Sequence, residues 1–79
     1  MRLVSVDQTI DCSELFCPLP TAKARRAIQG LSAGQVLEFI ATGEEVVGEV
    51  LHWVKQDRHE LLRSQQRQDG VFQFLVRKS

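Results

Sequence analysis

The alternation of apolar and polar residues along this chain predicts two helices and several short strands. Apolar residues at 3–6 predict a first strand, and residues 8–17 then form a long polar approach to the first helix. The helix is predicted over about residues 18–31, because apolar side chains recur there at three- and four-residue spacing. Its predicted inner face consists of Pro20, Ala24, Ala27, Ile28 and Leu31.

The middle of the chain predicts an inner strand followed by a second helix. Residues 36–41 are almost continuously apolar, which is typical of a strand that is covered on one face and partly shielded on the other. The four residues 42–45 predict a capping box, in which the Thr42 side chain binds the amide of Glu45 and Glu45 reaches back. The second helix then has a predicted buried stripe of Val46, Val47, Val50, Leu51 and Val54, with Trp53 at its edge.

The last third of the chain predicts a hairpin. A third strand is expected at residues 60–66 and a last strand at residues 71–77, joined by the turn-forming pair Asp69-Gly70. The element order is therefore βαβαββ, which predicts an α+β fold. We expect a two-layer α/β sandwich, with a four-stranded mixed sheet and two helices on one face. A crossover through the first helix would make the first two strands parallel.

Length and composition favour a small intracellular protein. With 79 residues, the chain is expected to form a single domain over residues 1–79. Its formal net charge of zero argues against strong direct binding of nucleic acid. Neither a signal peptide nor a run of membrane-spanning length is apparent, so we expect no membrane association and a cytoplasmic location. Two cysteines are too few for a disulfide framework, and their chemistry becomes the main question.

The most informative stretch is Cys17-Pro18-Leu19-Pro20. Proline has a fixed helical φ and no N–H, so it is tolerated in the first turn of a helix and disruptive further inside. The helix should therefore begin here, with Cys17 at or next to its N-cap. Unpaired amides and partial positive charge at a helix start favour the thiolate, which is the nucleophilic form of cysteine. We therefore predict Cys17 as a reactive thiol, with Pro18 and Pro20 supporting the helix entry.

Side chains near Cys17 predict a docking patch for a partner protein. On a helical wheel, Leu19 and Ala22 face outward beside Lys23 and Arg26, which gives a small apolar spot with a positive rim. The two cations would steer the protein toward an acidic partner and would further favour the thiolate. The alternative is that these charges are simply a solvated helix face.

Four other residues bear on the chemistry of the chain, namely Cys12, Asp11, His52 and His59. Cys12 is either a second thiol that resolves an oxidised Cys17 or an inert residue of the loop or core. Asp11 is expected to hold the approach loop through hydrogen bonds from its side chain to the backbone. We expect neither a metal site nor a cofactor, because His52 and His59 do not have the spacing of a zinc site with the cysteines.

The residues around Cys17 also resemble a known family. Their order and spacing are similar to the signature of TusA-like (SirA/YedF-type) sulfur-carrier proteins, and the resemblance extends over nearly the whole chain. It implies the same two-layer βαβαββ fold and a relay protein rather than a self-sufficient enzyme. It further implies that Cys17 accepts sulfane sulfur from a cysteine desulfurase as a persulfide and passes it to an acceptor protein. The residues that carry the resemblance are Asp11, Leu15, Cys17, Pro18, Pro20 and Lys23.

The sequence departs from the family signature at two places, so it does not identify the acceptor protein. Two rival functions are also open. Glu14 stands where the family has a glycine, and residues 42–45 differ from the acidic-acidic-proline pattern often found there. The acceptor could belong to tRNA thiolation, molybdenum-cofactor maturation or related sulfur trafficking. The rivals are a dithiol redox protein that uses Cys12 and Cys17, and a regulatory or RNA-binding module with the same element order.

Overall fold

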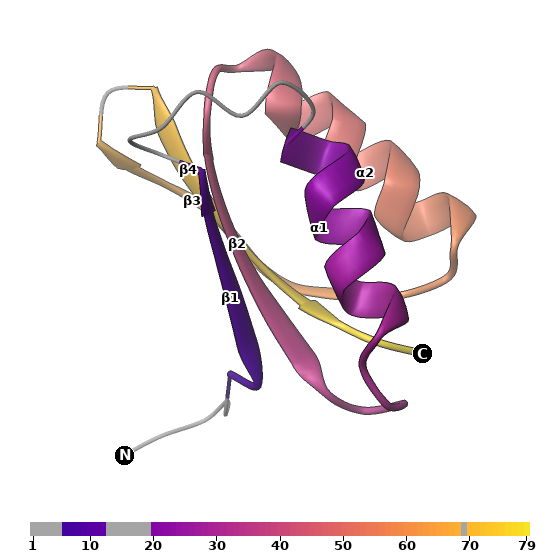
Figure 1. Ribbon diagram of the computed structural model, residues 1–79. Coiled ribbons are helices and arrows are strands. Elements are labelled where there is room, and N and C mark those ends of the chain that lie inside the picture. Colours follow the sequence, from indigo (N-terminus) through magenta and orange to yellow (C-terminus); the bar gives the residue numbers. More distant parts are fainter. Residues whose placement is uncertain (1–5, 13–19, 69) are drawn as a thin grey trace.

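The computed structural model describes residues 6–12, 20–68 and 70–79. Within them, strands and helices follow one another in the predicted order βαβαββ (Figure 1). The strands are β1 (Gln8–Cys12), β2 (Val36–Thr42), β3 (Glu60–Gln68) and β4 (Val71–Arg77), and the helices are α1 (Pro20–Gln29) and α2 (Glu45–Gln56).

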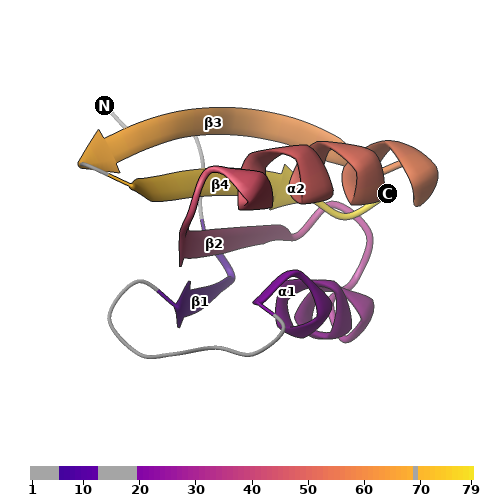
Figure 2. The same cartoon turned by 90° about the horizontal axis from the view of Figure 1, so that it is seen from above.

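The strands form one mixed sheet in the order β1-β2-β4-β3. β1 runs parallel to β2, whereas β4 pairs antiparallel with both β2 and β3. Both helices lie on the same face of this sheet, as Figures 1 and 2 show. The α+β two-layer sandwich is therefore confirmed. Neither α1 nor α2, the helices in the described residues, is long and apolar enough to cross a membrane.

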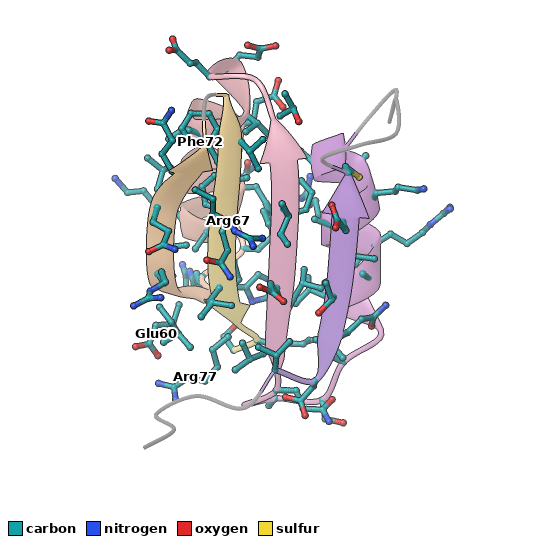
Figure 3. The ribbon with its side chains drawn as sticks, turned by 90° about the vertical axis from the view of Figure 1, so that its left-hand side faces the viewer. Glu60, Arg67, Phe72 and Arg77 are labelled. Carbon is teal, nitrogen blue, oxygen red and sulfur yellow. The ribbon has the colours of Figure 1, made fainter. Side chains whose placement is uncertain are left out.

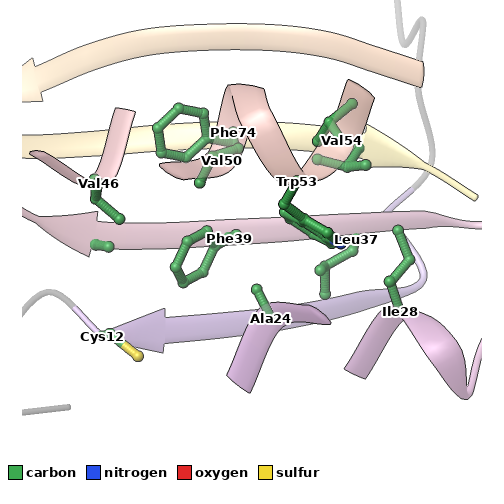
Figure 4. Packing of buried hydrophobic residues seen from close by; sticks show 12 residues of the cluster. Cys12, Ala24, Ile28, Leu37, Phe39, Val46, Val50, Trp53, Val54 and Phe74 are labelled. Carbon is green, nitrogen blue, oxygen red and sulfur yellow. The ribbon is translucent and has the colours of Figure 1, made fainter. Parts of the chain in front are cut away.

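The core fills the space between the sheet and the helices (Figure 4). The Phe39 ring of β2 packs on the Phe74 ring of β4, with ring centroids 6.0 Å apart. Burial of alternate strand residues follows from the pleat, which points every second side chain toward the helices. The rest of the buried cluster is Cys12, Ala24, Ile28, Leu37, Ala41, Val46, Val50, Trp53, Val54 and Val76.

The sheet face opposite the helices carries a chain of polar side chains across all four strands (Figure 3). Thr9 Oγ1 donates to Glu38 Oε1 at 3.1 Å, and Gln73 Nε2 donates to Glu38 Oε2. Gln65 Nε2 in turn donates to Gln73 Oε1 at 3.0 Å. Because these bonds satisfy polar groups on a partly buried surface, they support the alignment of the strands.

The first strand lies later in the chain than the pattern predicted. β1 consists of Gln8–Cys12, part of the segment that we expected to be a polar approach, and Val6 before it is exposed. The predicted strand positions 3–5 lie outside the described residues. β1 forms because its backbone pairs with β2, placing Ile10 beside Phe39 and Cys12 beside Ala41. Its polar side chains concealed the strand, since only every second residue needs to be apolar.

The predicted capping box at the start of α2 is wrong. Thr42 is the last residue of β2, and the N-cap of α2 is Glu44, which makes no side-chain capping bond. The chain turns instead at Gly43, whose φ of 109° suits glycine. The first bonds of the helix are made by backbone groups, with Val46 N–H donating to the Gly43 carbonyl oxygen at 3.2 Å.

The buried stripe of α2 is rotated from the predicted one. Leu51, which we expected in the core, is 46% exposed, whereas Trp53 is only 3% exposed. Val46, Val50 and Val54 are buried as predicted. The rotation arises because α1 packs beside α2. The buried face of α2 therefore points partly toward α1, and Trp53 belongs to this face (Figure 4).

The remaining boundaries agree with the predictions to within two residues. β4 has the predicted bounds, and β3 continues to Gln68, two residues further than expected. Asp69 lies outside the described residues, but Gln68 and Val71 face each other and Gly70 has a φ of 72°, as a tight hairpin requires. α1 ends at Gln29 rather than at residue 31. Pro18 and Leu19, its first two predicted residues, lie outside the described part.

Candidate functional site

The topology brings the starts of both helices to one end of the molecule. β1 and β2 are parallel, and each is followed in the chain by a helix that runs back along the sheet (Figure 1). α1 therefore begins at Pro20 and α2 at Glu45 near the same edge of the sheet. Each helix start presents backbone N–H groups without partners inside the helix and a partial positive charge.

The predicted reactive thiol, Cys17, lies shortly before the start of α1 in the sequence. Cys17, Pro18 and Leu19 lie outside the described residues, so their predicted roles remain predictions. Pro20 is the first residue of α1, as expected for a proline, which gives up no helical hydrogen bond in the first turn. Cys17 is three residues before it.

The cations of the predicted docking patch are exposed on α1. Ala22, Lys23 and Arg26 are all exposed, in agreement with the helical wheel. Within the described residues, neither Lys23 nor Arg26 has an ion-pair partner. Arg26 lines a groove between the two helices, whereas Lys23 does not. The structure therefore divides the predicted patch, with Arg26 beside the groove and Lys23 outside it.

Two side-chain pairs connect α1 with α2, and we call them the cross-helix pairs. Thr21 Oγ1 donates to Glu49 Oε1 at 2.8 Å. Arg25 binds Asp57, the C-cap of α2, through two parallel bonds of 3.0 and 3.2 Å. A guanidinium that binds a carboxylate through two such bonds is fixed in orientation as well as in position. Arg25 is therefore paired at the surface, where 46% of its side chain remains exposed.

The groove between the helices, called here the α1–α2 groove, has a volume of about 450 Å³. α1 contributes Ala22, Arg26 and Gln29 to its lining, and α2 contributes His52 and Trp53. Trp53 is buried, and its indole N–H has no hydrogen-bond partner among the described residues. The groove thus combines apolar surface with charged side chains of both signs, since Glu49 of α2 lines it together with Arg25 and Arg26 of α1.

Cys12 and Asp11 occupy the last two positions of β1 but face opposite sides of the sheet. Cys12 is 6% exposed and belongs to the core cluster. Asp11 is exposed and lies beside Ile40 of β2. A thiol inside an apolar core is shielded from the solvent and partners that thiol exchange requires. The loop that Asp11 was expected to hold lies outside the described residues.

His59 lies just before β3 and is tied to the end of the chain. Its Nδ1 accepts a hydrogen bond from Ser79 N–H at 3.2 Å, and its ring meets the edge of Trp53. Burial lowers the pKa of His59; Asp57 partly offsets this, and Lys78 and Arg25 add to the lowering. These contacts give His59 a structural role at the start of β3. In the described ranges, no group of three or more histidine, cysteine or acidic side chains could hold a metal ion.

Comparison with known proteins places the chain in a family. Residues 8–78 match the family described as Sulfurtransferase TusA, which spans β1 to the end of β4. The chain belongs to the TusA family. The sulfur carrier protein TusA of Allochromatium vinosum is 39% identical over 77 residues, which cover 98% of this chain and 100% of that protein. A putative sulfur carrier protein of Neisseria meningitidis serogroup A is 36% identical, covering 87% and 92%. One of Archaeoglobus fulgidus is 31% identical, covering 86% and 88%.

The TusA resemblance drawn from the residues around Cys17 is thereby confirmed. What the sequence did not reveal in this TusA-family chain is the α1–α2 groove. Its cross-helix pairs join residues 28 and 32 positions apart, and no local pattern links such residues. Trp53 gave a partial signal, because a large aromatic side chain at the edge of a helical stripe often packs against a neighbouring helix.

Proposed function

We propose that this TusA-family chain is a sulfur carrier that holds sulfane sulfur on Cys17. The observation that carries the proposal is the Cys17-Pro18-Leu19-Pro20 sequence, which leads directly into α1 within the segment that matches the family. The names of the relatives support it, since each is called a sulfur carrier or a putative one. The chain would act as a relay rather than as a self-sufficient enzyme.

The chemistry is an exchange of one sulfur atom. The Cys17 thiolate attacks the outer sulfur of a persulfide on the donor, a cysteine desulfurase. A new S–S bond forms at Cys17, the S–S bond of the donor breaks, and the donor cysteine leaves as a thiolate. Cys17 then carries the persulfide, and a nucleophile on the acceptor removes its outer sulfur. The first transfer needs no external oxidant or reductant, because the persulfide sulfur only changes its partner.

The residues around α1 would each support this exchange. The helix start favours the thiolate electrostatically, and Pro18 and Pro20 restrict the backbone, so that less entropy is lost when a partner binds. Asp11 would anchor the segment between β1 and α1. Leu19, Lys23 and Arg26 would contact the partner, and the exposure of the latter two is consistent with this role.

The acceptor belongs to a route such as tRNA thiolation, molybdenum-cofactor maturation or related sulfur trafficking. These routes all need a carrier whose thiol stays reduced between transfers. A cytoplasmic location, where thiols are kept reduced, is therefore part of the proposal.

Two features of the structure argue against the rival functions. A dithiol mechanism that exchanges with external partners requires an accessible second thiol, but Cys12 is only 6% exposed. RNA-binding sheets commonly stack bases on exposed aromatic side chains. The described aromatic side chains of this sheet, Phe39, Phe72 and Phe74, instead contribute to the core on the helix side.

Intact mass spectrometry tests the proposal directly. The chain is incubated with a purified cysteine desulfurase and cysteine, and its mass is measured with and without a thiol reductant. We expect the wild type to gain the mass of one sulfur atom, and the reductant to remove it. Cys17→Ser should show no gain, whereas the matched control Cys12→Ala should gain sulfur as the wild type does. A wild type that gains no sulfur would falsify the carrier function, and loss of the gain in Cys12→Ala would favour the dithiol mechanism.

A further inference from the structure

We infer that two copies of this chain associate through α2, with the two helices antiparallel and Leu51 of each copy packed on Gly48 of the other. The surface that carries the inference is a stripe of four exposed residues, called here the α2 stripe, which consists of Glu44, Gly48, Leu51 and Lys55. Self-association goes beyond the proposed carrier function and does not depend on it.

The α2 stripe follows one side of the helix from its N-cap to its last turn. Its members are separated by four, three and four positions, and residues at this spacing lie above one another on a helix. The same spacing marks the contact seam of helices that pair side by side. α2 belongs to the helix layer on one face of the sheet (Figure 2), and its buried residues lie on the opposite side of the helix from the α2 stripe. The α2 stripe is therefore available to another molecule.

Leu51 and Gly48 form a projection and a recess one turn apart. Leu51 is 46% exposed, and Val6 is the only other large apolar residue that is exposed in the described part of the chain. Glycine is unfavourable inside a helix, and no other part of the described chain comes within 4 Å of the place where a Cβ of Gly48 would lie. Packing within one copy therefore does not explain this glycine. A side chain from a second helix can approach the backbone there, because no Cβ stands in its way.

The charges at the ends of the α2 stripe complement those of an antiparallel copy. Glu44 and Lys55 are about 16 Å apart along the helix and have no ion-pair partner among the described residues. The pair Glu44–Lys55 and the pair Gly48–Leu51 are both centred between residues 49 and 50. One two-fold axis at this centre therefore places each Leu51 on the Gly48 of the other copy and each Glu44 beside a Lys55. A parallel arrangement would instead bring like charges together, which is unfavourable.

The size of the contact predicts a weak and reversible dimer. α2 has 12 residues and is therefore about 18 Å long, so a single helix pair buries less surface than a standard protein interface. The dimer should form only as the chain concentration rises. Because the contact is small, the two charge pairs at its ends should contribute a measurable share of the affinity.

Sedimentation velocity over a range of chain concentrations tests the inference. A thiol reductant is present throughout, so that disulfides between chains are excluded. The wild type should shift from monomer toward dimer as the concentration rises. Glu44→Lys and Lys55→Glu should each weaken this association at least about tenfold, because both charge pairs become repulsions. An equimolar mixture of the two variants should associate at least as well as the wild type, because each charge then faces its opposite in the other chain.

Two further variants separate the recess from the net charge. Gly48→Leu should weaken association by a similar factor by filling the recess, and it should keep the fold, because leucine is more favourable than glycine inside a helix. Arg63→Glu is the matched control for Lys55→Glu, since it makes the same charge change at an exposed position of β3. It should associate as the wild type does. Circular dichroism of each variant establishes that the fold is retained.

Recovery in the mixture is the decisive result, because variants that had lost their fold would not regain it on mixing. A wild type that stays monomeric at every concentration overturns the inference and leaves the α2 stripe to a helix of another protein. Unchanged association in the single variants, an equal loss in Arg63→Glu, or a mixture that does not recover overturns it as well. Sulfur loading of Cys17 tests the carrier function separately from all of these outcomes.

Discussion

Adjacent positions of α2 give the sharpest test of how the core is arranged. Val50 is 0% exposed, whereas Leu51 is 46% exposed, although the apolar pattern places both in the buried stripe. Removing one buried methylene costs about 0.5–1.5 kcal/mol, so the two methyl groups lost in Val50→Ala cost about 1–3 kcal/mol. Alanine's higher helix propensity offsets about 0.5 kcal/mol of this. The expected net loss is about 1.5 kcal/mol, from a total stability of about 4–12 kcal/mol for a chain of 79 residues.

Leu51 should behave differently although it is larger. Leu51→Ala should cost no more than about 1 kcal/mol, because water already reaches about half of the side chain. Leu51→Lys should fold normally, since a long cationic side chain can lie along the surface with its charge in water. In a true core position the same lysine would be a buried unpaired charge, which costs several kcal/mol.

Urea unfolding followed by tryptophan fluorescence measures these differences, because Trp53 is the only tryptophan and is buried. With a slope of about 1 kcal/mol per M, Val50→Ala should lower the midpoint by about 1.5 M. Leu51→Lys should lower it by less than about 1 M. If Leu51→Lys proves as destabilising as Val50→Ala, the rotated stripe of α2 is incorrect and the sequence pattern was the better guide.

Further predictions concern the pH dependence, the cross-helix pairs and the glycines. The pKa of His59 is lowered on folding, so its stabilising contribution is present above about pH 6.5 and is lost as the pH falls through the lowered value. Urea unfolding between pH 7 and pH 5 should therefore show a smaller loss of stability in His59→Asn than in the wild type. A double-mutant cycle on Arg25 and Asp57 should give a coupling of about 0.5–1 kcal/mol that weakens in high salt; no measurable coupling would contradict this. Gly48→Ala should stabilise the protein by about 0.5–1 kcal/mol in thermal unfolding, because an added Cβ meets nothing within 4 Å. Gly43→Ala should destabilise it by more than about 1 kcal/mol, owing to its φ of 109°.

Where apolar residues follow one clear period, the sequence predicted the structure well. β4 has the predicted bounds because Phe74 and Val76 alternate with outward-facing residues in a strand that a turn delimits. The inner face of α1 was predicted for the same reason, and Ala24 and Ile28 are fully buried. The family could be recognised from a short motif, in which a cysteine precedes two prolines at a helix start. This combination of residue types is chemically unusual.

Where structure depends on a distant partner, the sequence was a poor guide. β1 has few apolar residues and exists because β2, about 28 positions away, offers its backbone in parallel register. The exposure of Leu51 could not be predicted, because the helical pattern does not say on which side α1 lies. The groove depends on Arg25 and Asp57, whose attraction becomes visible only when the two helices are side by side.

α1 has one face that is buried in the core and one face that is exposed. Ala24 and Ile28 are fully buried against the sheet, so truncating Ile28 should lower stability. Ala22 and Arg26 are exposed, and substitutions at exposed positions typically change stability by less than about 0.5 kcal/mol. Variants of the outer face should therefore keep the fold, so their sulfur loading can be measured on a folded protein. Because the helix axis is fixed by the inner face, the start of α1 keeps its orientation in such variants. A change of sulfur loading in variants of Ala22 or Arg26 would therefore report on the exposed face of α1 rather than on a displaced helix start.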